Sequence, residues 1–196
     1  MTPSSRGLMP RSAFPQLQSA HLESRGVHLS ARESLGIATV MAKQGQAEAL
    51  RESVRKQFGI ELPSGPLRAH RAGVSFVGTG PDTWLATCEP GSNRFAGPLA
   101  EMIGEVAAVT DQGDAYAVLR LRGPRACEAL QKLVPIDLHQ RSFRQGHAAC
   151  TVAAEISVIF WRLENDDAGS SVFELAIPRS FADSVWHALM AGMPGG

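Results

Sequence analysis

Several features that would assign this chain to a particular functional class are scarce in its sequence. Its 19 Lys and Arg balance its 19 Asp and Glu, so the formal net charge is zero, and Lys43, Lys56 and Lys132 are its only lysines. Nucleic-acid-binding surfaces usually appear as clusters of Lys and Arg, and no such block occurs here. The composition therefore argues against an electrostatic nucleic-acid binder.

Cysteines and long apolar runs are also scarce. Cys88, Cys127 and Cys150 are an odd number of thiols without a C-x-x-C pair, which is typical of a reducing compartment. We interpret them as three buried thiols. No stretch approaches the roughly 18 consecutive apolar residues of a membrane span, and the N-terminus lacks the apolar core of a secretory signal. We therefore expect a soluble, cytoplasmic protein without contact to a membrane.

Motifs that carry chemistry are missing as well. No G-x-x-x-x-G-K-[ST] phosphate loop and no G-x-S-x-G nucleophile elbow occurs. Gly78-Thr79-Gly80 begins like a dinucleotide fingerprint, but Pro81 follows it and favours a turn between antiparallel strands. His147 and Cys150 lie three positions apart on a predicted strand and point to opposite faces, so they could not share a metal ion. We predict no catalytic, cofactor-binding or metal-binding residue in this chain.

The chain does contain two compact segments with an α+β pattern, preceded by a dissimilar stretch. Residues 1–34 are rich in Ser, Arg, Pro and Gly without a hydrophobic period, which predicts a flexible tail or a strap ordered by a partner. Residues 35–112 follow a β-α-β-β-α-β order, the ferredoxin-like arrangement. Residues 113–196 nearly repeat it as β-α-β-β-β-α. The predicted fold class is α+β, one globular domain of two ferredoxin-like-related units.

The individual elements are predicted from hydrophobic periodicity, which alternates along strands and recurs every three or four residues along helices. The expected strands cover residues 35–42, 74–79, 83–88, 105–110, 115–121, 148–154, 156–163 and 172–177. The expected helices cover residues 46–58, 93–103, 124–134 and 179–190.

The last predicted helix carries the candidate surface residues. Phe181, Val185 and Leu189 form its expected core stripe. Because this stripe is already filled, Trp186 and His187 are candidates for facing outward, toward a partner interface. Partial burial of Trp186 in the core of the chain itself is the alternative.

Several stretches of the sequence resemble one known family. The first is a G-P-x-A-x-x-x-L…P-x-D-L pattern at Gly123–Ala126, Leu130 and Pro135–Leu138. The most specific is Ile177–Trp186, which is similar to V-P-R-S-[FY]-A-x-S-[LV]-W. Ala108–Gln112 and the stretch from Gly80 to Leu85 also agree. These stretches resemble the gamma subunit of heterotetrameric sarcosine oxidase, and the similarity as a whole covers about residues 30–192.

The resemblance implies a fold and an assembly. Such gamma subunits are similar in fold to the folate-binding region of the glycine-cleavage T-protein. The assembly of alpha, beta, gamma and delta chains oxidises sarcosine to glycine and passes electrons through FAD and FMN to oxygen, which releases peroxide. Tetrahydrofolate accepts the methyl carbon, and NAD and zinc are also carried. The resemblance places these groups on other subunits, with the folate pocket on the alpha chain.

The sequence also departs from T-protein relatives, which have an Asn-Ala-x-Asn-type stretch near the position of Cys88–Asn93 here. The K-G-C-Y-x-G-Q-E segment of another branch is absent. We therefore expect a non-catalytic gamma subunit that packs chiefly against alpha and self-associates when isolated. One alternative is a stand-alone tetrahydrofolate-binding, aminomethyltransferase-like protein, with Glu89 or Asp111 as the carboxylate near the pterin. Another is a gamma-type subunit of an oxidase or dehydrogenase for a different N-methyl amino acid.

Overall fold

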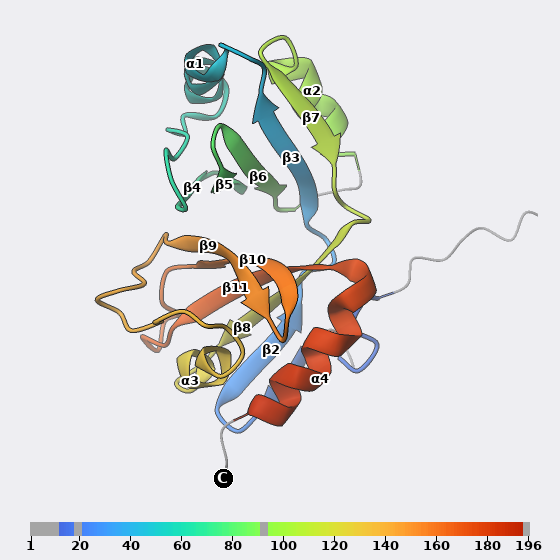
Figure 1. The fold of residues 1–196 in the computed structure, drawn as a ribbon, viewed down its shortest axis with the longest axis vertical. Coiled ribbons are helices and arrows are strands. Elements are labelled where there is room, and N and C mark those ends of the chain that lie inside the picture. The colour runs from blue at the N-terminus through green and yellow to red at the C-terminus, as the bar shows by residue number, and fades with distance from the viewer. Residues whose placement is uncertain (1–11, 18–20, 91–93, 194–196) are drawn as a thin grey trace, which may run out of the picture.

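The computed structural model describes residues 12–17, 21–90 and 94–193 of the chain. These residues form two antiparallel sheets with helices packed on their outer faces (Figure 1). One sheet has the strand order β4-β5-β6-β3-β7 and the other the order β1-β2-β8-β11-β10-β9. The predicted fold class, α+β with two ferredoxin-like-related units, is confirmed.

The first unit contains the five-stranded sheet and two helices. Its elements are β3 (Gly36–Ala42), α1 (Ala47–Phe58), β4 (Arg68–Arg71), β5 (Val74–Gly80), β6 (Thr83–Cys88), α2 (Ala96–Ile103) and β7 (Ala107–Asp111). Without β4, the neighbours β5-β6-β3-β7 follow the predicted β-α-β-β-α-β connection. The edge strand β4 was not predicted, because a four-residue strand has too few positions to show alternation.

The second unit follows the predicted β-α-β-β-β-α order. Its elements are β8 (Tyr116–Arg122), α3 (Ala126–Gln131), β9 (Ala148–Ala153), β10 (Ile156–Arg162), β11 (Val172–Pro178), the 3₁₀ turn η2 (Arg179–Phe181) and α4 (Ala182–Gly192). Helix α3 is shorter than the predicted 124–134 span, and the chain forms turns after it. The chain passes from the first sheet to the second between β7 and β8.

The prediction of a flexible tail over residues 1–34 is wrong for the part that forms strands β1 (His21–Ser24) and β2 (Val27–Ala31). Strand β2 pairs with β8, so this hairpin extends the second sheet. The residues of its turn, Arg25 and Gly26, both have positive φ, as a two-residue hairpin turn requires. Part of the predicted tail, residues 1–11 and 18–20, lies outside the described residues.

The hairpin is held closely against the start of α3. Gly123, between β8 and α3, has a φ of +120°, and a Cβ at this position would lie only 2.6 Å from the carbonyl oxygen of Gly26. The same carbonyl accepts a hydrogen bond from the backbone N–H of Arg125 at 3.2 Å. Glycine at position 123 therefore permits both the backbone conformation and the close approach.

The apolar side chains form three layers of core. One lies between the first sheet and α1 and α2, and a second lies between the second sheet and α3 and α4. The third lies between the two sheets and joins Ile37, Val77 and Leu85 of the first unit to Val118, Ala148, Trp161, Leu163, Val172 and Ala176 of the second. The order of layers is helix, sheet, sheet, helix, with α1 and α2 at one end and α3 and α4 at the other (Figure 1).

The hairpin gives the first testable prediction. Leu29 is fully buried in the core of the second unit. Replacing it with Ala removes buried methyl groups and leaves a cavity, so Leu29→Ala should lower the free energy of unfolding by about 2–5 kcal/mol in urea denaturation. Glu23→Ala changes an exposed residue of the same hairpin and should stay within about 0.5 kcal/mol. If Leu29→Ala lowers the free energy of unfolding as little as Glu23→Ala does, the hairpin is not packed on the core of the second unit.

Candidate functional site

A buried carboxylate lies between the two sheets. Along β11, Val172 and Ala176 point toward the first sheet, and the alternation of the strand places Glu174 on the same side. Glu174 is only 5% exposed. A buried charge is costly unless it is paired and hydrogen-bonded, so its surroundings must supply positive charge or donors.

The donors come from three different strand regions. Glu174 Oε1 accepts from Arg32 Nε at 3.0 Å, and from Arg120 Nη2 at 2.7 Å and Nε at 2.9 Å. Its other oxygen, Oε2, accepts from the indole Nε1 of Trp161 at 2.9 Å. Both carboxylate oxygens are thus bonded to donors of the chain itself. The arrangement is that of a structural ion pair.

The first unit contributes further charges to this cluster. Arg32 also pairs with Glu89, which follows β6, and this hydrogen bond lowers the pKa of Glu89. Arg68 of β4 points into the same region, and its buried Nε has no hydrogen-bond partner. Burial lowers the pKa of the Arg68 guanidinium, although the negative charges of Glu174 and Glu164 oppose this effect. Charges from both sheets therefore meet in one cluster.

The two carboxylates considered for a folate site have separate surroundings. Glu89 is bound to Arg32, as described above. Asp111 ends β7, is exposed, and accepts a hydrogen bond from the backbone N–H of Gly113 at 2.9 Å. This is the bond of an Asx turn, a common structural role for Asp. No interaction joins Glu89 to Asp111 within the described part of the chain.

The structure corrects the expected orientation of Trp186. Trp186 is 5% exposed and belongs to the core of the second unit. Its ring lies 6.4 Å from that of Phe14, a buried residue of the N-terminal segment. This segment, residues 12–17, packs on α4 and also donates a hydrogen bond from Gln16 to Asp183. The segment expected to order on a partner thus covers Trp186 of the same chain.

Because Trp186 is buried, the exposed side chains of this region are those of His187 and Phe181. His187 is exposed and its Nδ1 lies 2.8 Å from the carbonyl oxygen of Asp183, one helical turn earlier. Phe181, expected in the core stripe, is instead 48% exposed, because η2 turns it out of the helical spacing. The apolar side chain that α4 and its approach offer to solvent is therefore Phe181.

All three cysteines are free. Cys88 and Cys127 are half-buried, but Cys150 is exposed, so the prediction of three buried thiols is wrong for Cys150. Desolvation by surrounding atoms raises the pKa of each thiol, including that of Cys150. Since the thiolate is the reactive form, none of them has the environment of an activated nucleophile.

His147 and Cys150 have different partners. The ring of His147 packs edge-on against Phe143, and the Cys150 thiol donates to the carbonyl of Thr79 at 3.4 Å. Among the residues that the structure describes, no three His, Cys, Asp or Glu side chains are grouped as metal ligands would be. No helix within the described ranges is long and apolar enough to cross a membrane.

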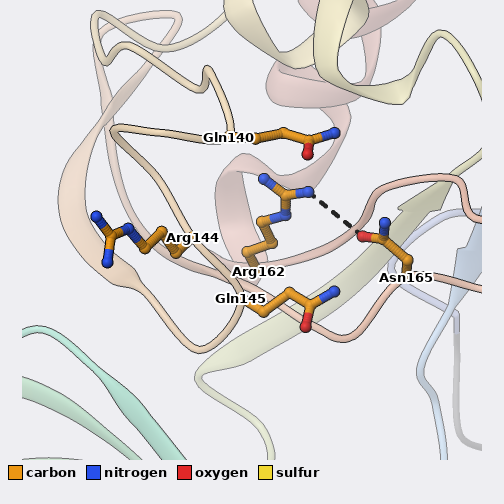
Figure 2. A pocket seen from close by; sticks show the side chains of 5 residues that line it. All are labelled: Gln140, Arg144, Gln145, Arg162 and Asn165. Atoms are coloured by element: carbon orange, nitrogen blue, oxygen red, sulfur yellow. Dashed lines mark hydrogen bonds between the residues drawn. The ribbon is translucent and has the colours of Figure 1, made fainter.

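An open pocket of about 280 Å³ lies at the end of β10. It is lined by Gln140, Arg144 and Gln145 from the loop before β9, and by Arg162 and Asn165 (Figure 2). No motif in the sequence predicted this pocket. The signal that could have revealed it is Arg162, which continues the alternation of Val158 and Phe160 on the helix-covered face, where an apolar residue is expected.

The comparisons with known proteins agree on a family. The model of the GCVT N-terminal domain matches residues 82–195, more than half of the chain. A sarcosine oxidase gamma subunit from Corynebacterium sp. (strain P-1) is 32% identical over 161 residues, which cover 81% of this chain and 74% of the relative. Another, from Arthrobacter sp., is 32% identical over 130 residues, which cover 65% of this chain and 62% of the relative.

Solved structures agree with the fold. A chain of the heterotetrameric sarcosine oxidase from Corynebacterium sp. U-96, in complex with pyrrole 2-carboxylate, superimposes with a TM-score of 0.76 at 26% identity, covering 94% of both chains. The aminomethyltransferase T of the glycine cleavage system from Bartonella henselae gives a TM-score of 0.58 at 12% identity, over 84% of this chain and 45% of that one.

The fold is thus that of the GCVT N-terminal domain, with two packed α+β units. Within this class, the chain belongs to the family of sarcosine oxidase gamma subunits, as the sequence motifs indicated.

The ion-pair cluster gives the second prediction. Glu174→Ala leaves Arg120 and the indole N–H of Trp161 without their acceptor and removes one of the two carboxylates that pair with Arg32, so it should lower the free energy of unfolding by about 3–5 kcal/mol. Glu174→Gln keeps one acceptor oxygen, so it should lower the free energy of unfolding by less than Glu174→Ala does. Urea denaturation measures both. The matched control is Glu128→Gln, which breaks an exposed pair with Arg125 and should have little effect. A Glu174→Ala chain as stable as the control would refute the structural role.

Proposed function

We propose that this chain is the non-catalytic gamma subunit of a heterotetrameric sarcosine oxidase, with a structural role against the alpha subunit. The observation that carries the proposal is the match to gamma subunits over 81% of the chain, together with the 0.76 TM-score to a chain of a heterotetrameric enzyme. A structural role also agrees with the use of Glu174, whose oxygens are already bonded to Arg32, Arg120 and Trp161.

The proposed reaction belongs to the assembly. It is the oxidative demethylation of sarcosine to glycine, in which the methyl carbon passes to tetrahydrofolate and oxygen is reduced to peroxide. We propose that FAD, FMN, NAD, tetrahydrofolate and zinc are held by the other subunits, and that alpha, beta and delta are the partners, chiefly alpha. The cytoplasm is the proposed compartment, in keeping with three free cysteines.

The proposed interface lies on the outer side of η2 and α4. His187 stays in this proposal because it is exposed, whereas Trp186 at 5% exposure offers little surface. Phe181 supplies the apolar contact in its place, since half-exposed aromatic side chains are frequent anchors of subunit interfaces. Trp186 then acts from beneath, by supporting the helix that presents these residues.

Phe181→Asp tests this interface. A charge at the centre of an apolar contact should weaken capture of the alpha subunit by the tagged chain at least tenfold after co-expression, while the unfolding midpoint of the isolated chain stays close to that of the parent. The matched control is Met102→Asp, which changes an equally exposed apolar residue on α2 of the other unit. If both variants capture the alpha subunit equally well, α4 is not part of the interface.

The subunit role itself is tested by purifying the tagged chain from its native cells. A yellow complex with sarcosine-dependent peroxide release is expected. Isolated, the chain should self-associate in sedimentation velocity, because the surface covered by its partner is then open. A colourless, monomeric chain that binds tetrahydrofolate saturably would instead support the stand-alone folate protein.

A further inference from the structure

Arg162 is a buried cation without a counter-charge. It is 3% exposed, and it forms no ion pair with a carboxylate within the described part of the chain. Its guanidinium donates to three neutral acceptors: the carbonyl of Phe143 at 2.8 Å, the amide oxygen of Asn165 at 3.3 Å and the hydroxyl of Ser171 at 3.1 Å. Buried charges are normally paired, so this environment is unusual.

Part of the donor capacity of Arg162 is also unused. Its Nε is buried and has no hydrogen-bond partner. A guanidinium has more N–H donors than the three acceptors named above take up. The ring of Phe173, 5.7 Å from the guanidinium carbon, offers only a cation–π contact.

The carboxylates of the neighbouring loops are engaged elsewhere. Asp166 accepts backbone hydrogen bonds from Ala168 and Ser170 within its own turn. Asp137 accepts from Ser142 at 2.6 Å and from the backbone of His139. Among the described residues, neither of these carboxylates nor any other forms an ion pair with Arg162.

The open pocket lies directly at this guanidinium. Figure 2 shows the Arg162 head group at its centre, with the amide side chains of Gln140 and Gln145 on either side and Asn165 at the end of a dashed bond. Arg144 lies at the rim with its guanidinium turned outward. All five lining residues carry N–H donors, and none carries a negative charge.

We propose that this pocket is a binding site for a small oxyanion, a carboxylate or phosphate group, and that the guanidinium of Arg162 is its main hydrogen-bond donor. An oxyanion supplies the missing negative charge and accepts from both guanidinium and amide donors. A volume of about 280 Å³ accommodates such a group and is near the lower end of small-molecule sites. The hydrogen bonds to the neutral acceptors of Phe143, Asn165 and Ser171 hold the guanidinium in place before the anion binds. Binding therefore costs less side-chain entropy at Arg162.

The experiment uses the full chain at neutral pH and constant ionic strength set with sodium chloride. Inorganic phosphate and acetate are titrated separately, which distinguishes a phosphate site from a carboxylate site. The Arg162 Nε–H resonance, assigned with an Arg162→Lys variant, should shift saturably with at least one of the two anions. The midpoint of thermal unfolding should rise with the same anion, because a ligand that binds the native state stabilises it.

Variants separate the site from general anion effects. Gln145→Ala removes a lining amide and should weaken the saturating anion several-fold. Arg162→Lys keeps one charge but loses the planar fork, and should weaken it at least tenfold. The control is Arg141→Ala, an exposed arginine of the same loop that does not line the pocket; it should leave the affinity unchanged.

The proposal fails if neither anion gives a saturable shift of the Arg162 Nε–H resonance. It also fails if Arg141→Ala weakens binding as much as Gln145→Ala, since that result would indicate attraction to the surface in general. If Arg162→Lys does not fold, the resonance, once assigned from Gln145→Ala and neighbouring contacts, and the Gln145→Ala affinity still decide the question.

Discussion

Burial of charge between the two sheets is the constraint on which the rest of the fold depends. The inner face of the second sheet carries Glu174 beside apolar residues, so packing the sheets together requires donors for this carboxylate. Arg120 and Trp161 come from adjacent strands, but Arg32 comes from the end of the N-terminal hairpin. Because Arg32 also binds Glu89 of the first unit, it connects the hairpin, the second sheet and the first sheet at one point.

The length of each element and the distance in sequence to its partner explain which parts of the fold the sequence predicts. Strand β8 and helix α1 are long enough to repeat their hydrophobic period, and both lie close to the predicted spans. The hairpin β1–β2 has strands of four and five residues around an Arg-Gly turn. Alternation over so few positions is weak, and the surrounding Ser and Arg composition is typical of a tail. What orders these strands is pairing with β8, a contact distant in the sequence.

The candidate surface residues show the same limit at the level of single side chains. Helical spacing correctly indicates that Val185 and Leu189 face the core. It cannot indicate that Phe14, from the opposite end of the chain, covers Trp186, or that the 3₁₀ turn before α4 exposes Phe181. Arg162 is similar, because the sequence places a charge on a strand face but does not show whether a carboxylate or an open pocket lies beside it. Burial of a polar residue depends on what packs against it.

The pairing of Glu174 and Glu89 also bears on the proposed role of this chain in the assembly. A general acid, base or ligand-binding carboxylate needs at least one oxygen available to its substrate. Here the packing of two sheets uses both oxygens of Glu174, and Glu89 pairs with Arg32. Freeing Glu174 for chemistry would leave Arg120 and the indole of Trp161 without their acceptor, and freeing Glu89 would remove the ion pair that joins Arg32 to the first unit. The two uses compete for the same atoms, and this competition supports the proposal that the chain has a structural role in the assembly.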